Sequence, residues 1–187
     1  MQKMKKIVTA SVLSIVALFS SFFNTSVSAA NSDLKVGDMA PAFELVNQFG
    51  ETISLESQQG QWVVLYFYPK NDTPGCTTEA CSFRDNINAL IAQEAVILGV
   101  SADDKASHAE FAKKYKLPFS LLADEDTQVA SLYGSVLDLK VVKFAKRHSF
   151  IIDPQGKIAK IYRDVDPDKH VREVMADLKQ FQDSASK

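Results

Sequence analysis

The sequence predicts an α/β domain built on a central mixed β-sheet that is flanked by helices. Three observations predict this fold class. Residues 62–68 form a continuous aromatic and branched run, apolar residues at helical spacing follow it, and the same strand–helix order returns further along the chain. Strands and helices that alternate in this way pack as layers about one sheet.

The first half of the chain predicts one strand–helix–strand unit after a short entry strand at residues 43–46. Residues 62–68 (WVVLYFY) contain no charged side chain, which is typical of an interior strand buried on both faces. After the loop at residues 69–75, five apolar residues recur at helical spacing: Ala80, Phe83, Ile87, Leu90 and Ile91. Residues 95–100 (AVILGV) then predict the next buried strand.

A second unit follows, with a helix over residues 104–115 and a strand over residues 120–123. Pro118 lies between them and cannot continue a helix. A short helix over residues 128–133 is expected next, and Gly134 is a suitable residue to end it.

The end of the chain predicts a hairpin and a last helix. Residues 148–152 and 157–162 flank the turn sequence Asp153-Pro154-Gln155-Gly156. Residues 168–182 then place Val171, Val174, Met175 and Leu178 on one helical face. The complete order of elements is that of a thioredoxin-like fold.

The first residues predict a secretory signal peptide over residues 1–29, followed by one domain over residues 30–187. Three lysines precede an apolar run at residues 7–23, and small residues follow that run. Cleavage is expected after Ala29, with Ala30 as the alternative. An uncleaved membrane anchor is the competing interpretation, but the run is short for a bilayer span and contains four serines.

We therefore expect a periplasmic or secreted protein with no stable membrane association after cleavage. Loss of the three lysines would change the net charge of the chain from −2 to −5. A negative chain is a poor partner for nucleic acid or an anionic membrane, so we expect a small or neutral ligand. We also expect a monomer.

The segment from Pro69 to Cys81 (PKNDTPGCTTEAC) joins the interior strand to the first helix and carries the expected chemistry. Ligands bind at such strand ends in open α/β sheets. Cys76 falls at the helix start, where unpaired backbone N–H groups and the helix dipole stabilise an anion. We expect a partly accessible thiolate, the reactive form of cysteine, with the hydroxyl of Thr73 close to it.

Pro69, Thr73 and Cys76 match the P-x-x-x-T-x-x-C motif, and in this the chain resembles the peroxiredoxins. Cys81, followed by Phe83-Arg84-Asp85, resembles the Q-type branch, also called bacterioferritin comigratory proteins. The likeness extends from about Leu34 to Met175, with further matching segments at residues 37–43, 117–124 and 147–153.

The resemblance implies a thiol peroxidase with a role for each matching residue. Cys76 would attack the peroxide and become a sulfenic acid, and Cys81 would resolve that acid as a disulfide. Thr73 would orient the peroxide and Pro69 would shield the sulfur. Arg147 would hold the thiolate and the peroxide oxygens, a role that suits its permanent charge and rigid set of donors.

The resemblance also implies a hydroperoxide substrate, either hydrogen peroxide or an organic one, and no cofactor or metal. A dithiol such as a thioredoxin-like protein would be the reductant. One segment departs from the family pattern, because residues 135–146 (SVLDLKVVKFAK) are richer in Leu and Val than the glycine-containing segment expected before Arg147. The sequence leaves the conformation of that segment open.

Three alternatives use the two cysteines differently. A permanent Cys76–Cys81 disulfide conflicts with a helix, which separates their Cα atoms by about 8.7 Å where a disulfide needs under roughly 7 Å. In a copper site three residues separate the two cysteines, whereas four lie between Cys76 and Cys81. His108, His148 and His170 show no ligand spacing with them and are expected at the surface or rim. Disulfide exchange on other proteins usually employs Cys-x-x-Cys, which this chain lacks.

Overall fold

The computed structural model describes residues 34–185, so the predicted signal peptide at residues 1–29 lies outside the described residues. The described chain has one seven-stranded mixed sheet in the order β2-β1-β5-β4-β3-β8-β9. The strands are β1 (Glu44–Asn47), β2 (Thr52–Ser54), β3 (Trp62–Phe67), β4 (Ala95–Ser101), β5 (Ser120–Ala123), β8 (His148–Ile152) and β9 (Ile158–Tyr162). The predicted mixed sheet is confirmed, since β3 runs parallel to β4 and antiparallel to β8.

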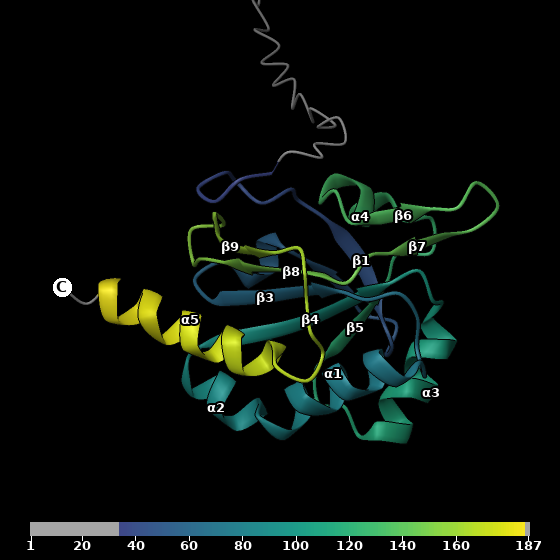
Figure 1. Ribbon diagram of the computed structural model, residues 1–187, viewed down its shortest axis with the longest axis horizontal. Coiled ribbons are helices and arrows are strands. Elements are labelled where there is room, and N and C mark those ends of the chain that lie inside the picture. Colours follow the sequence, from purple (N-terminus) through teal and green to yellow (C-terminus); the bar gives the residue numbers. More distant parts are fainter. Residues whose placement is uncertain (1–33, 186–187) are drawn as a thin grey trace, which may run out of the picture.

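Helices cover both faces of this sheet (Figure 1). One face carries α1 (Pro74–Asp85), α2 (Ile87–Ala92), α3 (Lys105–Tyr115) and α5 (His170–Ala185), and the other carries α4 (Gln128–Leu132). A short 3₁₀ helix, η1 (Glu56–Gln58), follows β2. The arrangement confirms the thioredoxin-like architecture.

The interior strand β3 divides the core into two halves. Successive side chains of a strand point to opposite faces, so Val64 and Tyr66 pack against α1, α2, α3 and α5 while Val63 and Leu65 pack on the side of α4. Residues 63–67 are at most 1% exposed. The uninterrupted apolar run therefore has the double-sided burial that its sequence predicts.

Two parts of the chain differ from the expected order of elements. The helical pattern after Cys76 forms two helices, because Asn86 leaves the helical conformation (φ −106°, ψ 9°) and divides α1 from α2. Residues 135–146 form a hairpin of β6 (Val136–Asp138) and β7 (Lys143–Ala145), which pair only with each other. Strands of three residues contain too few alternations to be recognised in a sequence.

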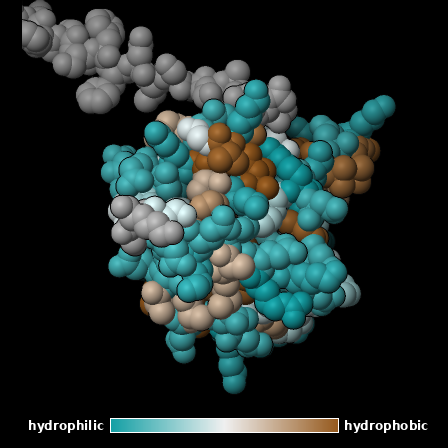
Figure 2. Space-filling model, turned by 60° about the vertical axis from the view of Figure 1, so that its left-hand side comes forward, coloured by the Kyte–Doolittle hydropathy of each residue, from teal (hydrophilic) through white to brown (hydrophobic). Residues whose placement is uncertain are grey.

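The surface in Figure 2 is mostly hydrophilic and carries small, separate apolar patches. Several exposed apolar side chains belong to the β6–β7 hairpin, including Leu139, Val142 and the almost fully exposed Val141. Among residues 34–185, no helix is both long and apolar enough to cross a membrane.

Candidate active site

Cys76 lies in the first turn of α1, at the end of the loop that leaves β3. Thr73 precedes the helix with extended backbone angles, and Pro74 is its first residue, where the missing N–H of proline costs nothing. The Cys76 side chain is only 1% exposed, whereas the sequence predicted partial accessibility. It is buried because it packs between α1 and the sheet, against the aromatic core that contains Tyr66 and Phe83.

Arg147 reaches this cysteine from a distant part of the sequence. Its neighbour His148 pairs with Phe67 at the end of β3, and this register places Arg147 beside the loop that follows β3. The guanidinium donates from Nη2 to the Cys76 sulfur at 3.2 Å. Gly75 permits this approach, because a Cβ there would lie 3.2 Å from the same nitrogen.

Glu79 is the second partner of Arg147, and the sequence reasoning missed it. Arg147 Nη1 donates to Glu79 Oε2 at 2.5 Å, and the Glu79 side chain is fully buried. Burial raises the pKa of Glu79 to about 7, although Arg147 acts in the opposite direction. The missed signal is periodicity, because positions 76, 79, 80 and 83 form the buried face of α1 and one of them is charged.

Burial would lower the pKa of Arg147, but its charge interactions with Glu79 and Cys76 outweigh burial and raise it. The guanidinium is therefore a permanent cation in contact with one carboxyl group and one sulfur. This cation and the first turn of α1 both stabilise negative charge on the Cys76 sulfur.

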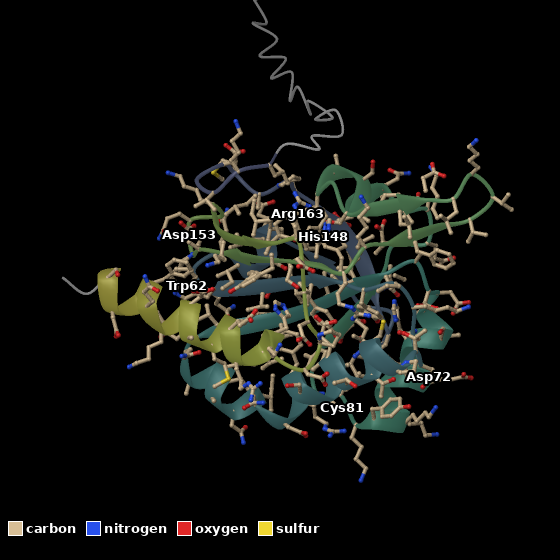
Figure 3. The ribbon with its side chains drawn as sticks, viewed as in Figure 1. Trp62, Asp72, Cys81, His148, Asp153 and Arg163 are labelled. Atoms are coloured by element: carbon tan, nitrogen blue, oxygen red, sulfur yellow. The ribbon has the colours of Figure 1, made fainter. Side chains whose placement is uncertain are left out.

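All three histidines are buried, so their predicted surface or rim positions are wrong. Each ring has polar partners inside the fold, which permits burial. His148 Nδ1 accepts a hydrogen bond from Arg163 Nη1 at 2.9 Å, and the two residues lie side by side in Figure 3. His170, the first residue of α5, lies 2.8 Å from Ser149 Oγ and 4.0 Å from Glu79 Oε1. Burial and the Arg147 charge lower the His170 pKa to about 4.

The remaining predicted site residues lie around the same turn. Pro69 is half-buried where the loop leaves β3, and the Thr73 hydroxyl donates to the Lys70 carbonyl at 3.0 Å, which leaves its oxygen able to accept. Cys81 is half-buried further along α1 (Figure 3), and both cysteines are free thiols. The unbroken helix over both positions agrees with the separation that the sequence analysis assumed.

The sequence matches the model of the AhpC/TSA family over residues 36–161. The chain belongs to this family. It is 44% identical to the putative peroxiredoxin bcp of Coxiella burnetii over 149 residues, which are 78% of this chain and 99% of the relative. It is 42% identical to peroxiredoxin Bcp of Bacillus subtilis over 152 residues, which are 78% of this chain and 96% of the relative.

Solved structures agree with this assignment. Peroxidoxin BcpB of Mycobacterium tuberculosis superposes with a TM-score of 0.75 at 33% identity, over 79% of this chain and 98% of that one. A mutant of PrxQ from Xylella fastidiosa superposes with a TM-score of 0.76 at 30% identity, over 81% of this chain and 99% of that one. The protein is a peroxiredoxin of the Q, or Bcp, group and a thiol-dependent peroxidase.

Replacing Thr73 by valine in this peroxiredoxin should slow oxidation of the cysteine by about 100-fold, the usual effect of removing one hydrogen bond to a reacting oxygen. Valine keeps the shape of threonine and deletes only the hydroxyl. Stopped-flow oxidation by hydrogen peroxide measures the rate, and thiol alkylation across pH serves as the control for thiolate formation, which should not change. An unchanged oxidation rate would remove Thr73 from the site.

Replacing Glu79 by glutamine should change how the stability of this peroxiredoxin depends on pH. The pKa of the folded carboxyl, about 7, lies above its ordinary value of 4.5. Its contribution to folding is therefore complete below pH 4.5 and is lost as pH rises through 7. The stability of the natural protein relative to Glu79→Gln should fall by roughly 3 kcal/mol over that interval.

Urea unfolding of both proteins at a series of pH values measures this difference directly. The other titrating groups are common to both proteins, so their contributions cancel to first order. A difference that stays constant with pH would show that the buried carboxyl has an ordinary affinity for its proton.

Proposed function

We propose that this peroxiredoxin reduces hydrogen peroxide and organic hydroperoxides by a two-cysteine cycle at Cys76 and Cys81. The observation that carries the proposal is the 3.2 Å contact between Arg147 and the Cys76 sulfur at the start of α1. A structure of the bacterioferritin comigratory protein of Xanthomonas campestris, 30% identical to this chain, concerns alkyl peroxide reduction by that protein. This supports the organic branch of the substrate class.

In the first step the Cys76 thiolate attacks one peroxide oxygen, and the oxygen–oxygen bond breaks. The sulfur becomes a sulfenic acid, and the other oxygen leaves as an alcohol or water after taking up a proton. Arg147 stabilises the negative charge that moves from the sulfur to the leaving oxygen. The Thr73 oxygen, whose hydrogen is donated to the Lys70 carbonyl, accepts a hydrogen bond from the peroxide, and Pro69 shields the sulfur from water.

In the second step the Cys81 sulfur attacks the Cys76 sulfenic acid, water leaves, and a disulfide forms. A helix holds these Cα atoms about 8.7 Å apart, beyond the limit of roughly 7 Å for a disulfide. The turn at residues 77–80 must therefore unwind. Glu79 lies in that turn, so unwinding also separates it from Arg147. A thioredoxin-type dithiol then reduces the disulfide.

Formation of the disulfide should accelerate amide hydrogen exchange across residues 76–83. The helical hydrogen bonds of this turn break in the oxidised form, while β3 keeps its pairing with β4 and β8 and should exchange equally in both forms. Mass spectrometry of peptides from the reduced and oxidised proteins measures the exchange. Equal protection of residues 76–83 in both forms, with a proven Cys76–Cys81 disulfide, would contradict unwinding.

The cycle is tested by peroxide consumption with a panel of dithiol donors and by the Cys81→Ser variant. This variant should complete the first oxidation and then accumulate sulfenic acid on Cys76, which mass spectrometry detects after one equivalent of peroxide. Absence of sulfenic acid on Cys76 of this variant after one equivalent of peroxide would count against the resolving role of Cys81.

We also propose that the protein is exported to the periplasm or secreted, and that the mature chain is a monomer. The lysines and apolar run of residues 1–29 support export. The mass of the protein recovered from its native host tests whether the signal peptide is cleaved. A chain that begins at Ala30 or Asn31 is expected, and a chain that retains residues 1–29 would contradict cleavage. Gel filtration of the mature chain tests the oligomeric state.

A further inference from the structure

The loop between β3 and α1, residues 69–73, is held at its centre by Asn71. This side chain is 7% exposed and uses both ends of its amide. Its Oδ1 accepts from the Tyr68 hydroxyl at 2.8 Å, and its Nδ2 donates to Ser107 Oγ at 2.9 Å and to His108 Nδ1 at 3.1 Å. The loop is thereby attached to α3.

The backbone of the same residue is attached to the end of β4. The Asn71 N–H donates to Asp103 Oδ2 at 2.9 Å, and that oxygen also accepts from Ser101 Oγ at 2.7 Å. The next residue, Asp72, differs, because it pairs with Lys114 at the exposed outer edge of the protein (Figure 3). Within this loop, Asn71 makes the buried attachment and Asp72 makes the solvated one.

The direction of the bond between Asn71 and His108 follows from the other side of the imidazole ring. His108 Nε2 lies 3.2 Å from the Leu122 carbonyl, which can only accept, so Nε2 carries the hydrogen. In the neutral ring Nδ1 is then an acceptor, and the Asn71 amide must turn its NH₂ group toward it. Burial lowers the pKa of His108, which favours this neutral ring.

We propose that Asn71 and His108 are positioning residues of the peroxide site. The inference rests on the proposed roles of Pro69 and Thr73, which lie two residues before and two residues after Asn71. Because the loop is this short, a displaced Asn71 displaces the Thr73 hydroxyl. Errors of about 1 Å in a reacting geometry reduce rates by about 100-fold.

The polarity of this contact provides a sharp test. In Asn71→Asp, a carboxylate oxygen replaces the NH₂ group and faces the lone pair of His108 Nδ1, so the contact requires one additional proton. The groups that face His108 are Tyr68 directly after β3, Asn71 from the loop, Asp103 and Asp104 before α3, and the Leu122 carbonyl from β5. The two aspartates favour that proton.

The experiment measures in stopped flow the rate at which hydrogen peroxide oxidises Cys76. The rate of each variant is divided by the rate of the natural protein at the same pH. Asn71→Asp should be about 10- to 100-fold slower at pH 8 and should recover toward pH 6. Combining it with His108→Asn supplies a non-titrating NH₂ donor at the Nδ1 position, which should remove the pH dependence and restore most of the rate. Lys114→Ala, which releases the exposed pair with Asp72 and the contact of Lys114 with the Tyr115 ring, is the matched control and should oxidise normally.

Two outcomes would overturn the inference. A rate ratio for Asn71→Asp that is independent of pH would show that the polarity of the contact does not matter. Asn71→Asp could also slow oxidation of Cys76 and resolution by Cys81 by the same factor while lowering the urea midpoint of unfolding. Asn71 would then be a stabilising residue only. Failure of the proposed function itself would look different, because Cys76 of the natural protein would then not be oxidised at all.

Discussion

Replacing Cys76 by serine abolishes peroxide reduction and leaves the protein folded. A serine hydroxyl does not ionise in the pH range where a thiol does, so neither the first turn of α1 nor Arg147 can convert it into an anionic nucleophile. The substitution is nearly isosteric, and the helix and the core around it remain. We expect a loss of at least about 1,000-fold in peroxide consumption, as for other variants that lack their nucleophile.

Activity is measured by the disappearance of hydrogen peroxide with dithiothreitol as reductant, and folding by circular dichroism and urea unfolding. Cys81→Ser is the matched control, because it removes the other sulfur and should retain the first oxidation. Substantial activity in folded Cys76→Ser would place the nucleophile elsewhere in the chain.

Replacing Arg147 by methionine reduces the rate of cysteine oxidation by about 100- to 1,000-fold, the usual effect of losing a group that stabilises a developing charge. Methionine has a comparable length and no charge. Two losses combine, because the guanidinium contacts the Cys76 sulfur and is also the donor proposed for the leaving oxygen. The thiolate loses its cation, and the leaving oxygen loses its donor.

Oxidation rates measured across pH separate these two losses. At a pH where the thiol of the variant is fully ionised, the deficit that remains belongs to the transition state. If the full oxidation rate returned at high pH, the role of Arg147 would be limited to stabilising the thiolate. Arg163→Met is the matched control, since Arg163 is also partly buried but bonds His148 and the Tyr133 carbonyl, and it should oxidise at a nearly normal rate.

The long elements could be predicted from sequence because their patterns are local. Residues 62–68 are apolar throughout, and the elements from β3 to β5 and the final hairpin and helix follow expected boundaries within a few residues. The division of α1 from α2 could not be predicted, because apolar spacing continues past Asn86. The conformation at Asn86 depends on one residue, and a helical pattern contains no signal for it.

The motif residues of the candidate site could be named from the sequence, but the partners that contact them could not. Cys76, Thr73 and Pro69 lie within one loop and turn, whereas Arg147 meets Glu79 only after β8 pairs with β3. The histidines illustrate the same limit. His108 is buried because Asn71 and the Leu122 carbonyl meet its two nitrogens, and both belong to other elements. Burial of a polar group is decided by partners that are distant in sequence.

The β6–β7 hairpin has a consequence for how the chain can vary. Its strands pair only with each other, and the Lys146 N–H donates to the Ser135 carbonyl at 2.6 Å, so the hairpin begins and ends at nearly the same point. Insertions, deletions or a new binding sequence at its tip, around Val141, would leave that point in place. The register of β8 against β3, and with it the position of Arg147, is set by strand pairs that follow the hairpin in the sequence, beginning with His148 opposite Phe67. We therefore expect this hairpin to accept foreign sequence, such as an affinity epitope, without displacing the arginine.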